Sequence, residues 1–126
     1  MARRVVMIGF KERVRAIQTA GYEVVELDAI DRLSSLERLD GEVIVILVED
    51  TRAGCALLAE GREDPVIIGV KNAAESFKAW SAGASSCIIK QRITNDEDVR
   101  EVSTDDEVVV WISKIFESME SAPEPV

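Results

Sequence analysis

The chain has 126 residues, of which 47% are hydrophobic and 31% are charged, a composition typical of one globular domain. Its formal net charge of −9 disfavours binding to nucleic acid or to an anionic membrane, and no apolar run approaches the roughly 18 residues of a membrane-spanning helix. The chain contains no histidine, which excludes histidine-based catalysis, histidine zinc ligands and a histidine phosphoacceptor. We therefore expect a cytoplasmic protein whose two cysteines, Cys55 and Cys87, stay reduced.

Apolar strand-like runs alternate with helix-like segments along the chain. In chain order, the expected elements are a strand at 4–10, a helix at 11–21, a strand at 22–28, a helix at 29–41, a strand at 42–49, a helix at 51–61, a strand at 65–70, a helix at 72–81, a strand at 86–90 and a helix at 108–119. This alternation predicts a single doubly wound α/β domain of five βα units, with a parallel five-stranded sheet and helices on both faces. Any ligand is then expected at the carboxyl ends of the strands.

Capping residues mark the starts of three expected helices. Thr51 is the expected N-cap of the third helix. Asn72 with Glu75, and Thr104 with Glu107, have the three-residue spacing of a capping box at the starts of the last two helices.

One domain is expected to cover residues 1–120, followed by a polar C-terminal tail at 121–126. The only long polar segment is 91–106, which we interpret as an acidic insertion between the last strand and the last helix. Segments of this length without secondary structure are often functional or mobile.

Three stretches resemble the receiver domain of two-component response regulators: AGYEVVE at 20–26, PVIIGV at 65–70 and AGASSCIIK at 82–90. The last stretch is similar to the small-residue turn, the fifth strand and the terminal lysine of that family. The resemblance extends over roughly residues 3–120 and implies a parallel sheet with the flavodoxin-like strand order 2-1-3-4-5.

Receivers accept a phosphoryl group from a histidine kinase on an aspartate, with the help of Mg²⁺. The resemblance implies an acidic pair after strand 1 for the metal, an aspartate after strand 3, a hydroxyl after strand 4 and a lysine after strand 5. In this chain Gly9 and Phe10 replace the acidic pair and Val70 replaces the hydroxyl, whereas Lys90 is present. Because neither glycine nor phenylalanine can ligate Mg²⁺, we predict no metal site, no cofactor and no catalysis.

The nucleophile position at the end of strand 3 is ambiguous, because the register places it on an apolar residue, on Glu49 or on Asp50. Lys90 has three interpretations: a phosphate-binding lysine in a working receiver, a solvated lysine at a strand end, or an ion-pair partner of Glu49 or Asp50. Such an ion pair would imitate the charges of a phosphorylated receiver, and it would contribute about 0–1 kcal/mol to stability.

Large apolar side chains in the second half of the chain predict an interface, although core packing is the alternative for each tryptophan. The candidate residues are Trp80, Val108, Trp111 and Phe116, on the face formed by the helix at 72–81, the strand at 86–90 and the helix at 108–119. We expect a protein partner or a second copy of the chain on this face. The acidic charge of 91–106 favours a basic protein over nucleic acid.

These residues together predict a stand-alone pseudo-receiver that acts in signal transduction by protein–protein interaction, without Mg²⁺-dependent aspartyl phosphorylation. One alternative is a phosphoacceptor response regulator that uses Asp50 with unusual metal ligation. Another alternative is a flavodoxin-like module that binds a small molecule, because a fold does not determine its function.

Overall fold

The computed structural model describes residues 3–37, 42–94 and 97–120. The polar tail expected at 121–126 lies outside the described residues. Within the described ranges, no helix combines the length and the apolar character needed to cross a membrane.

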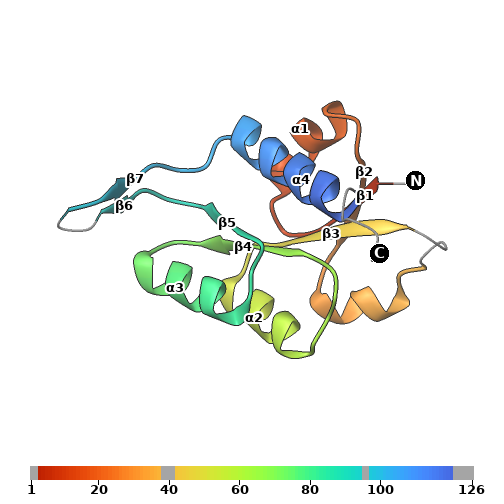
Figure 1. The fold of residues 1–126 in the computed structure, drawn as a ribbon, viewed down its shortest axis with the longest axis horizontal. Coiled ribbons are helices and arrows are strands. Elements are labelled where there is room, and N and C mark those ends of the chain that lie inside the picture. The colour runs from red at the N-terminus through yellow and green to blue at the C-terminus, as the bar shows by residue number, and fades with distance from the viewer. Residues whose placement is uncertain (1–2, 38–41, 95–96, 121–126) are drawn as a thin grey trace, which may run out of the picture.

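Five parallel strands form one sheet with the order β2-β1-β3-β4-β5, which confirms the predicted α/β fold (Figure 1). The strands are β1 (Arg3–Ile8), β2 (Glu23–Leu27), β3 (Val43–Val48), β4 (Val66–Val70) and β5 (Ser86–Ile89). The central strands β3 and β4 are almost wholly buried, as expected of parallel strands covered on both faces. Ile8 of β1 pairs with Val48 of β3, so these two strands end side by side at one edge of the sheet.

Helices cover both faces of the sheet (Figure 1). On one face lie α4 (Asp105–Glu120) and α1 (Val14–Thr19), which is preceded by the short 3₁₀ turn η1 (Lys11–Arg13). On the other face lie α2 (Thr51–Ala59), α3 (Ala73–Ala82) and the 3₁₀ helix η2 (Ile30–Ser35). The crossovers between parallel strands therefore run on both sides, as a doubly wound sheet requires.

Each face of the sheet has its own apolar core. Alternate residues of β1 contribute to the two cores, because successive side chains of a strand point to opposite faces. Val5 and Met7 pack toward α1 and α4, whereas Val6 and Ile8 pack toward η2, α2 and α3.

The capping predictions for the last two helices are confirmed. The Asn72 Oδ1 atom accepts a hydrogen bond of 2.8 Å from the Glu75 amide at the start of α3. At the start of α4, the Thr104 hydroxyl accepts from the Glu107 amide at 3.1 Å, and the Glu107 carboxylate accepts from the Thr104 amide at 3.1 Å. The second pair is a complete capping box.

The N-cap predicted for the third helix is wrong by one residue. Asp50 caps α2, because its Oδ2 atom accepts from the Ala53 amide at 2.8 Å. Thr51 is the first helical residue, and its hydroxyl is buried, 2.7 Å from the Gly69 carbonyl oxygen. A carboxylate is a strong N-cap. Because Asp50 caps α2, the Thr51 hydroxyl can donate to the Gly69 carbonyl oxygen of β4 instead.

The helix expected at 29–41 is a shorter 3₁₀ helix, η2, and residues 38–41 lie outside the described ranges. Leu33 is buried, and Leu36 adopts an extended conformation directly after η2. Leucines at three-residue spacing fit the three-residue period of a 3₁₀ helix, in which positions i and i+3 align. A helical segment therefore forms here as expected, but it is of the 3₁₀ type and ends earlier.

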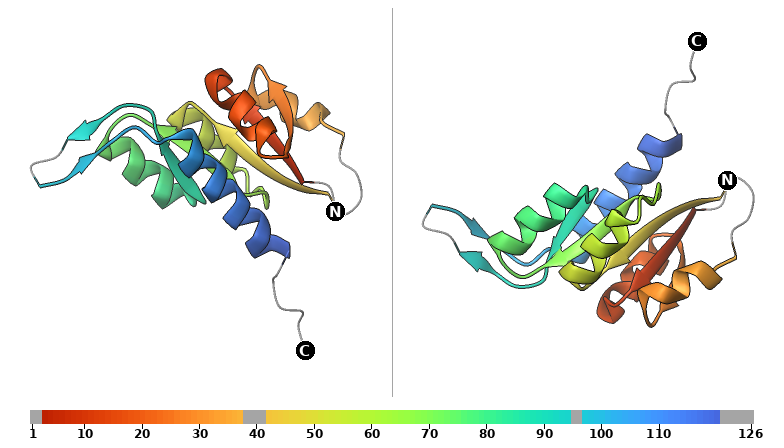
Figure 2. Two further views of the ribbon diagram at one scale, coloured as in Figure 1. Left: turned by 90° about the horizontal axis from the view of Figure 1, so that it is seen from above. Right: turned by 90° about the horizontal axis from the view of Figure 1, so that it is seen from below.

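The segment at 91–106 contains a two-stranded antiparallel hairpin, which the sequence analysis did not predict. β6 (Ile93–Thr94) pairs with β7 (Val99–Arg100). The β-branched residues Ile93, Thr94 and Val99 favour extended backbone in this otherwise polar segment. In both views of Figure 2 the hairpin extends away from the body of the domain.

Arg4 links β1 to the segment before β3. Its Nη2 atom donates to Glu42 Oε2 and to the Glu37 carbonyl oxygen, each at 2.7 Å, and the Glu42 side chain is only 2% exposed. We predict that Arg4→Met lowers the free energy of unfolding by about 3 kcal/mol, because the buried Glu42 carboxylate loses its guanidinium.

Urea denaturation followed by circular dichroism measures this effect. Arg3→Met is the matched control, because Arg3 pairs with Glu120 at the surface and its removal should change the free energy of unfolding much less. Equal losses in the two variants would contradict the structural role of Arg4.

Candidate functional site

A hollow of about 740 Å³ lies at the carboxyl ends of the strands. Its lining includes one residue shortly after each strand end, namely Gly9, Asp28, Glu49, Lys71 and Lys90. This is the edge at which a doubly wound sheet presents ligands and at which the sequence analysis placed the degenerate site. None of the described hairpin residues lines it, so the hairpin does not cover this hollow.

The structure resolves the register at the end of β3. The Glu49 amide donates to the Ile8 carbonyl oxygen at 3.0 Å, so Glu49 lies beside Gly9 and Asp50 lies one residue further along. The Glu49 carboxylate bends back across β1 and accepts a hydrogen bond from the Phe10 amide. This contact requires a glycine at position 9, where φ is +97° and a Cβ atom would lie 2.5 Å from Glu49 Cβ.

Phe10 turns away from the hollow and into the core between the sheet and the helices α1 and α4. It adopts a left-handed backbone conformation with φ of 54°, and its side chain is 1% exposed. A positive φ is uncommon for a bulky residue, so the surrounding contacts must stabilise it. Burial of the ring and the hydrogen bond from its amide to Glu49 supply those contacts.

Lys90 reaches back from the end of β5 to the end of β3. Its Nζ atom donates a 2.6 Å hydrogen bond to the Glu49 main-chain carbonyl oxygen, and its amide donates to the carbonyl oxygen of the buried Val70. No ion pair of Lys90 occurs within the described residues, so the ion pair with Glu49 or Asp50 that the sequence analysis considered is not formed. Lys90 binds the Glu49 carbonyl oxygen in place of the Glu49 carboxylate, because the Glu49 side chain points to β1.

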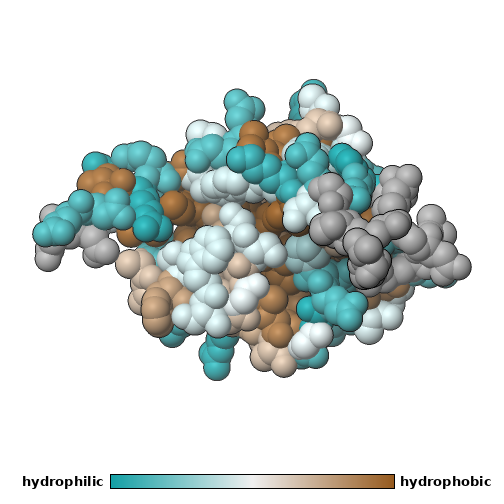
Figure 3. Space-filling view, in the orientation of Figure 1, coloured by the Kyte–Doolittle hydropathy of each residue, from teal (hydrophilic) through white to brown (hydrophobic). Residues whose placement is uncertain are grey.

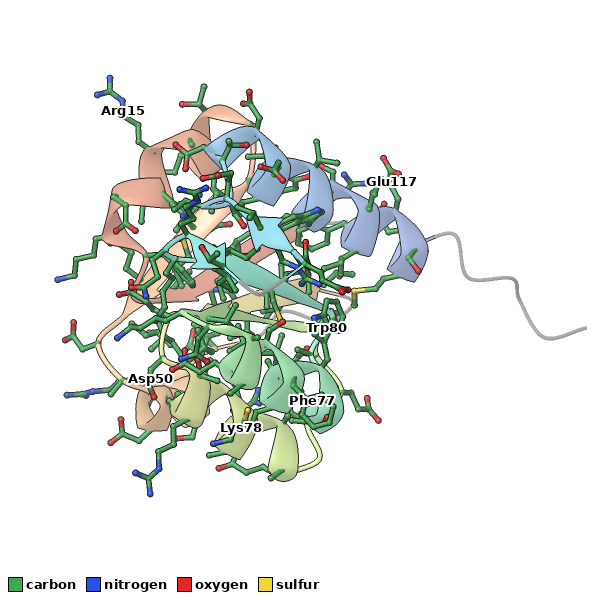
Figure 4. The ribbon with its side chains drawn as sticks, turned by 90° about the vertical axis from the view of Figure 1, so that its left-hand side faces the viewer. Arg15, Asp50, Phe77, Lys78, Trp80 and Glu117 are labelled. Carbon is green, nitrogen blue, oxygen red and sulfur yellow. The ribbon has the colours of Figure 1, made fainter. Side chains whose placement is uncertain are left out.

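Asp50 is exposed and caps the start of α2, as described above. Figure 4 shows it at the surface of the molecule near the beginning of that helix. The two acidic residues that the sequence analysis considered for the nucleophile position therefore have separate structural roles, with Glu49 at β1 and Asp50 at α2.

A polar contact between the starts of α2 and α3 was not predicted. The Glu75 Oε1 atom lies 2.9 Å from the Thr51 hydroxyl and accepts a 2.9 Å hydrogen bond from the Lys71 amide. Partial burial of Glu75 would raise its pKa, but these two hydrogen bonds and the charges of Lys90 and Lys71 outweigh burial and hold the pKa below its usual range. The three-residue spacing from Asn72 predicted that Glu75 belongs to a capping box, but nothing in the sequence indicated its contact with Thr51.

The described residues contain no group of three or more His, Cys, Asp or Glu side chains that could hold a metal ion. Both cysteines are free, and burial together with the nearby Cys55 raises the pKa of Cys87 to about 11. Cys87 is therefore a protonated thiol at neutral pH and a poor nucleophile.

The four candidate interface residues divide between the core and the surface. Val108 and Phe116 are fully buried against the sheet, so the prediction that they form an interface is wrong: they lie on the inward face of α4. Trp111 is partly buried against the same core, whereas Trp80 is 51% exposed on α3. Sequence reasoning missed Phe77, which is 74% exposed one helical turn before Trp80.

Comparisons of the chain with protein-family models, with curated proteins and with solved structures found no match.

We predict that Gly9→Ala lowers the free energy of unfolding by about 3 kcal/mol, because a methyl group at positive φ must also displace the Glu49 side chain. Gly21→Ala is the matched control, since Gly21 has φ of +102° and open space around the new methyl group. In the control, the free energy of unfolding should fall by only about 1–2 kcal/mol, the cost of holding an alanine at positive φ. Chemical denaturation compares the two variants. Equal decreases in the free energy of unfolding would contradict the prediction, because they would show that the Glu49 side chain moves aside without cost.

We also predict a pH-dependent role for Glu75. A carboxyl whose pKa is lowered on folding stabilises the protein above its ordinary pKa of 4.5, and this contribution is lost as the pH falls through the folded value. Glu75→Gln should therefore lower the free energy of unfolding by about 1 kcal/mol at pH 7, with a smaller difference from the wild type below pH 4.5. Urea denaturation across this pH range measures it, and the exposed Glu63→Gln is the control.

Proposed function

We propose that the chain is a receiver-like signalling module, a pseudo-receiver, that acts in the cytoplasm by binding a protein partner and does not require phosphorylation. One observation carries this proposal: at the carboxyl edge, the Lys90 ammonium is bound to the Glu49 carbonyl while the Glu49 carboxylate is bound to the Phe10 amide. The groups that would handle a phosphoryl group in a receiver are thus engaged with one another.

The chemistry of phosphoryl transfer supports this proposal. A phosphoryl donor and a carboxylate are both anions, and a divalent cation normally lies between them and neutralises the charge that develops. Gly9 and Phe10 offer no side-chain oxygen at the end of β1, and the Phe10 ring is buried in the core. Without that cation, an aspartyl phosphate would form slowly.

Asp50 is the residue that a phosphoacceptor function would use. It faces the hollow at its rim and is exposed, but its carboxylate caps α2. Modification of the carboxylate would remove an N-cap, which typically costs about 1 kcal/mol. This contact favours a structural role for Asp50 over a catalytic one.

Partner binding is assigned to the face of α3, β5 and α4, on which Trp80 is exposed. A half-exposed tryptophan is a frequent anchor of protein interfaces. On this proposal the domain offers one conformation to its partner, because the contacts of Lys90 and Glu49 are present without any phosphoryl group.

Amide NMR spectra recorded with Mg²⁺ and beryllium fluoride, a phosphoryl mimic, test this function. We predict no localised shifts at Gly9, Asp50, Val70 and Lys90, because no group of three or more acidic side chains that could hold Mg²⁺ occurs among the described residues. Saturable shifts at these residues that disappear in Asp50→Asn would overturn the proposal and assign a phosphoacceptor function.

A further inference from the structure

The chain has two cysteines, and both pack into the same apolar core, between the sheet and the helices α2 and α3. Cys87 belongs to β5 and is buried in this core, whereas Cys55 of α2 packs against it and stays partly exposed. Both thiols are free, and neither lines the hollow at the carboxyl edge. The contacts of the carboxyl edge therefore give these two thiols no role.

A close approach of α2 to the sheet brings Cys55 toward β5. Gly54 lies against Ile68 of β4, where a Cβ atom on the glycine would be 2.7 Å from Ile68 Cγ1. The helix backbone is therefore closer to the strand than a residue with a side chain would allow. Ile68 pairs with Cys87 in the register of β4 and β5, so Gly54 contacts the direct neighbour of Cys87. Cys55 is the next residue of the helix after Gly54.

The side of α2 that carries Cys55 faces α3. Thr51 lies one helical turn before Cys55, and residues four apart share one side of a helix. The Thr51 hydroxyl lies 2.9 Å from the Glu75 carboxylate of α3, which orients this side of α2 toward α3. Cys55 therefore points into the space between α2, α3 and β5.

Cys87 lies in the same space, under the first turns of α3. The side chain of Ser76, a buried residue of α3, is hydrogen-bonded to the Cys87 thiol. Burial raises the pKa of Cys87, and the neighbouring Cys55 contributes to the same rise, as expected of two thiols close to each other. Register, helix side and electrostatics thus agree in placing the two sulfur atoms together.

We propose that Cys55 and Cys87 form a reversible disulfide when the protein meets a hydroperoxide, and that this bond changes the outer surface of α3. Cys55 is the thiol that the oxidant reaches first, because it is partly exposed while Cys87 is only 8% exposed. Cys87 is then the resolving thiol.

The reaction takes place in two steps that consume one hydrogen peroxide. The Cys55 sulfur attacks one peroxide oxygen, the O–O bond breaks, and Cys55 becomes a sulfenic acid with release of water. The Cys87 sulfur then attacks the Cys55 sulfur, the S–O bond breaks, and the hydroxyl leaves with the Cys87 proton as a second water. The two thiols together give up two electrons, and these reduce both peroxide oxygens.

Oxidation alters the support of α3. The Cys87 sulfur becomes bonded to Cys55, so the Ser76 side chain loses the thiol as a partner. The bond also fixes α2 to β5 with the two Cα atoms about 4.4–6.8 Å apart, and α3 packs against both elements. The position of α3 therefore depends on whether the disulfide is present.

The outer side of α3 carries the exposed aromatic residues of this region. Phe77 directly follows Ser76 in the chain, and Trp80 lies one turn later; Figure 4 shows both along α3. In Figure 3 the atoms over α3 are mostly pale or brown, with few hydrophilic side chains. A displacement of α3 at Ser76 therefore moves an apolar surface that is open to a partner.

The control of α3 rests on the proposed function, because α3 belongs to the face assigned to a protein partner, whereas formation of the disulfide does not depend on it. In a reducing compartment a disulfide between two such thiols is transient and acts as a redox signal. Peroxide would then regulate partner binding without any phosphoryl group.

Hydrogen peroxide added to the full chain tests the disulfide, with free thiols counted by iodoacetamide labelling and mass spectrometry. We predict the loss of both free thiols in each chain, a monomer mass lower by two hydrogen atoms, and a proteolytic fragment that links Cys55 to Cys87. Dithiothreitol should restore both thiols. Peroxide that leaves both thiols free, or that links two chains, would overturn the inference.

Two variants assign the roles of the thiols. In Cys87→Ala the first step should still occur, so dimedone should label a sulfenic acid at Cys55. In Cys55→Ala the buried Cys87 should remain a free thiol under the same conditions. Circular dichroism confirms that each variant is folded. Equal dimedone labelling of the two variants would contradict the assigned order of attack.

Fluorescence of Trp80 tests the effect on α3, in the full chain with Trp111→Phe so that a single tryptophan reports. We predict a shift of its emission on oxidation that dithiothreitol reverses and that Cys55→Ala abolishes. Unchanged emission in the disulfide-linked chain would overturn the control of α3. The NMR experiment with beryllium fluoride uses the reduced protein and reads the carboxyl edge, so its failure is distinguishable from a failure here.

Discussion

The carboxyl edge of the sheet depends on Glu49, whose main chain and side chain bind in opposite directions. Its carbonyl oxygen accepts from the Lys90 ammonium at the end of β5, and its carboxylate accepts from the Phe10 amide at the end of β1. One residue thereby connects three strand ends across β4. Gly69 of β4 lies in the middle, where a Cβ atom would be 2.5 Å from the Glu49 carbonyl oxygen and 3.0 Å from Lys90 Cδ. Close packing of this kind leaves little room for rearrangement.

Much of the fold could be predicted from the sequence, because apolar runs of strand length alternate with segments of helical period. The continuous run at 42–49 correctly indicated the buried central strand, and the capping pairs at the starts of α3 and α4 were correct. These signals are local, and the sequence contains them in full. The hairpin was missed because each of its strands pairs only two residues, too few for a period to be recognised.

The contacts at the site were less predictable, because they depend on directions that a single sequence does not contain. The sequence placed Lys90 at the end of the fifth strand, but it did not reveal the partner of the lysine. The Lys90 ammonium binds the main-chain oxygen of Glu49 because the Glu49 side chain turns toward Gly9. The interface residues show the same limit. Val108 and Val110 are two positions apart in one apolar run, yet the first is fully buried and the second is 47% exposed. Only the placement of α4 on the sheet distinguishes them.

The carboxyl edge of the sheet and the outer surface of α3 differ in how far their side chains have partners within the chain. At the edge, Lys90, Glu49 and Asp50 each have a partner within the chain, so a ligand there would have to replace existing hydrogen bonds. On α3, Phe77 and Trp80 expose apolar surface to water, so covering them requires no exchange of hydrogen bonds and is favoured by the hydrophobic effect. Uncovered apolar surface is therefore a property of α3, whereas Lys90, Glu49 and Asp50 at the edge are held by hydrogen bonds within the chain.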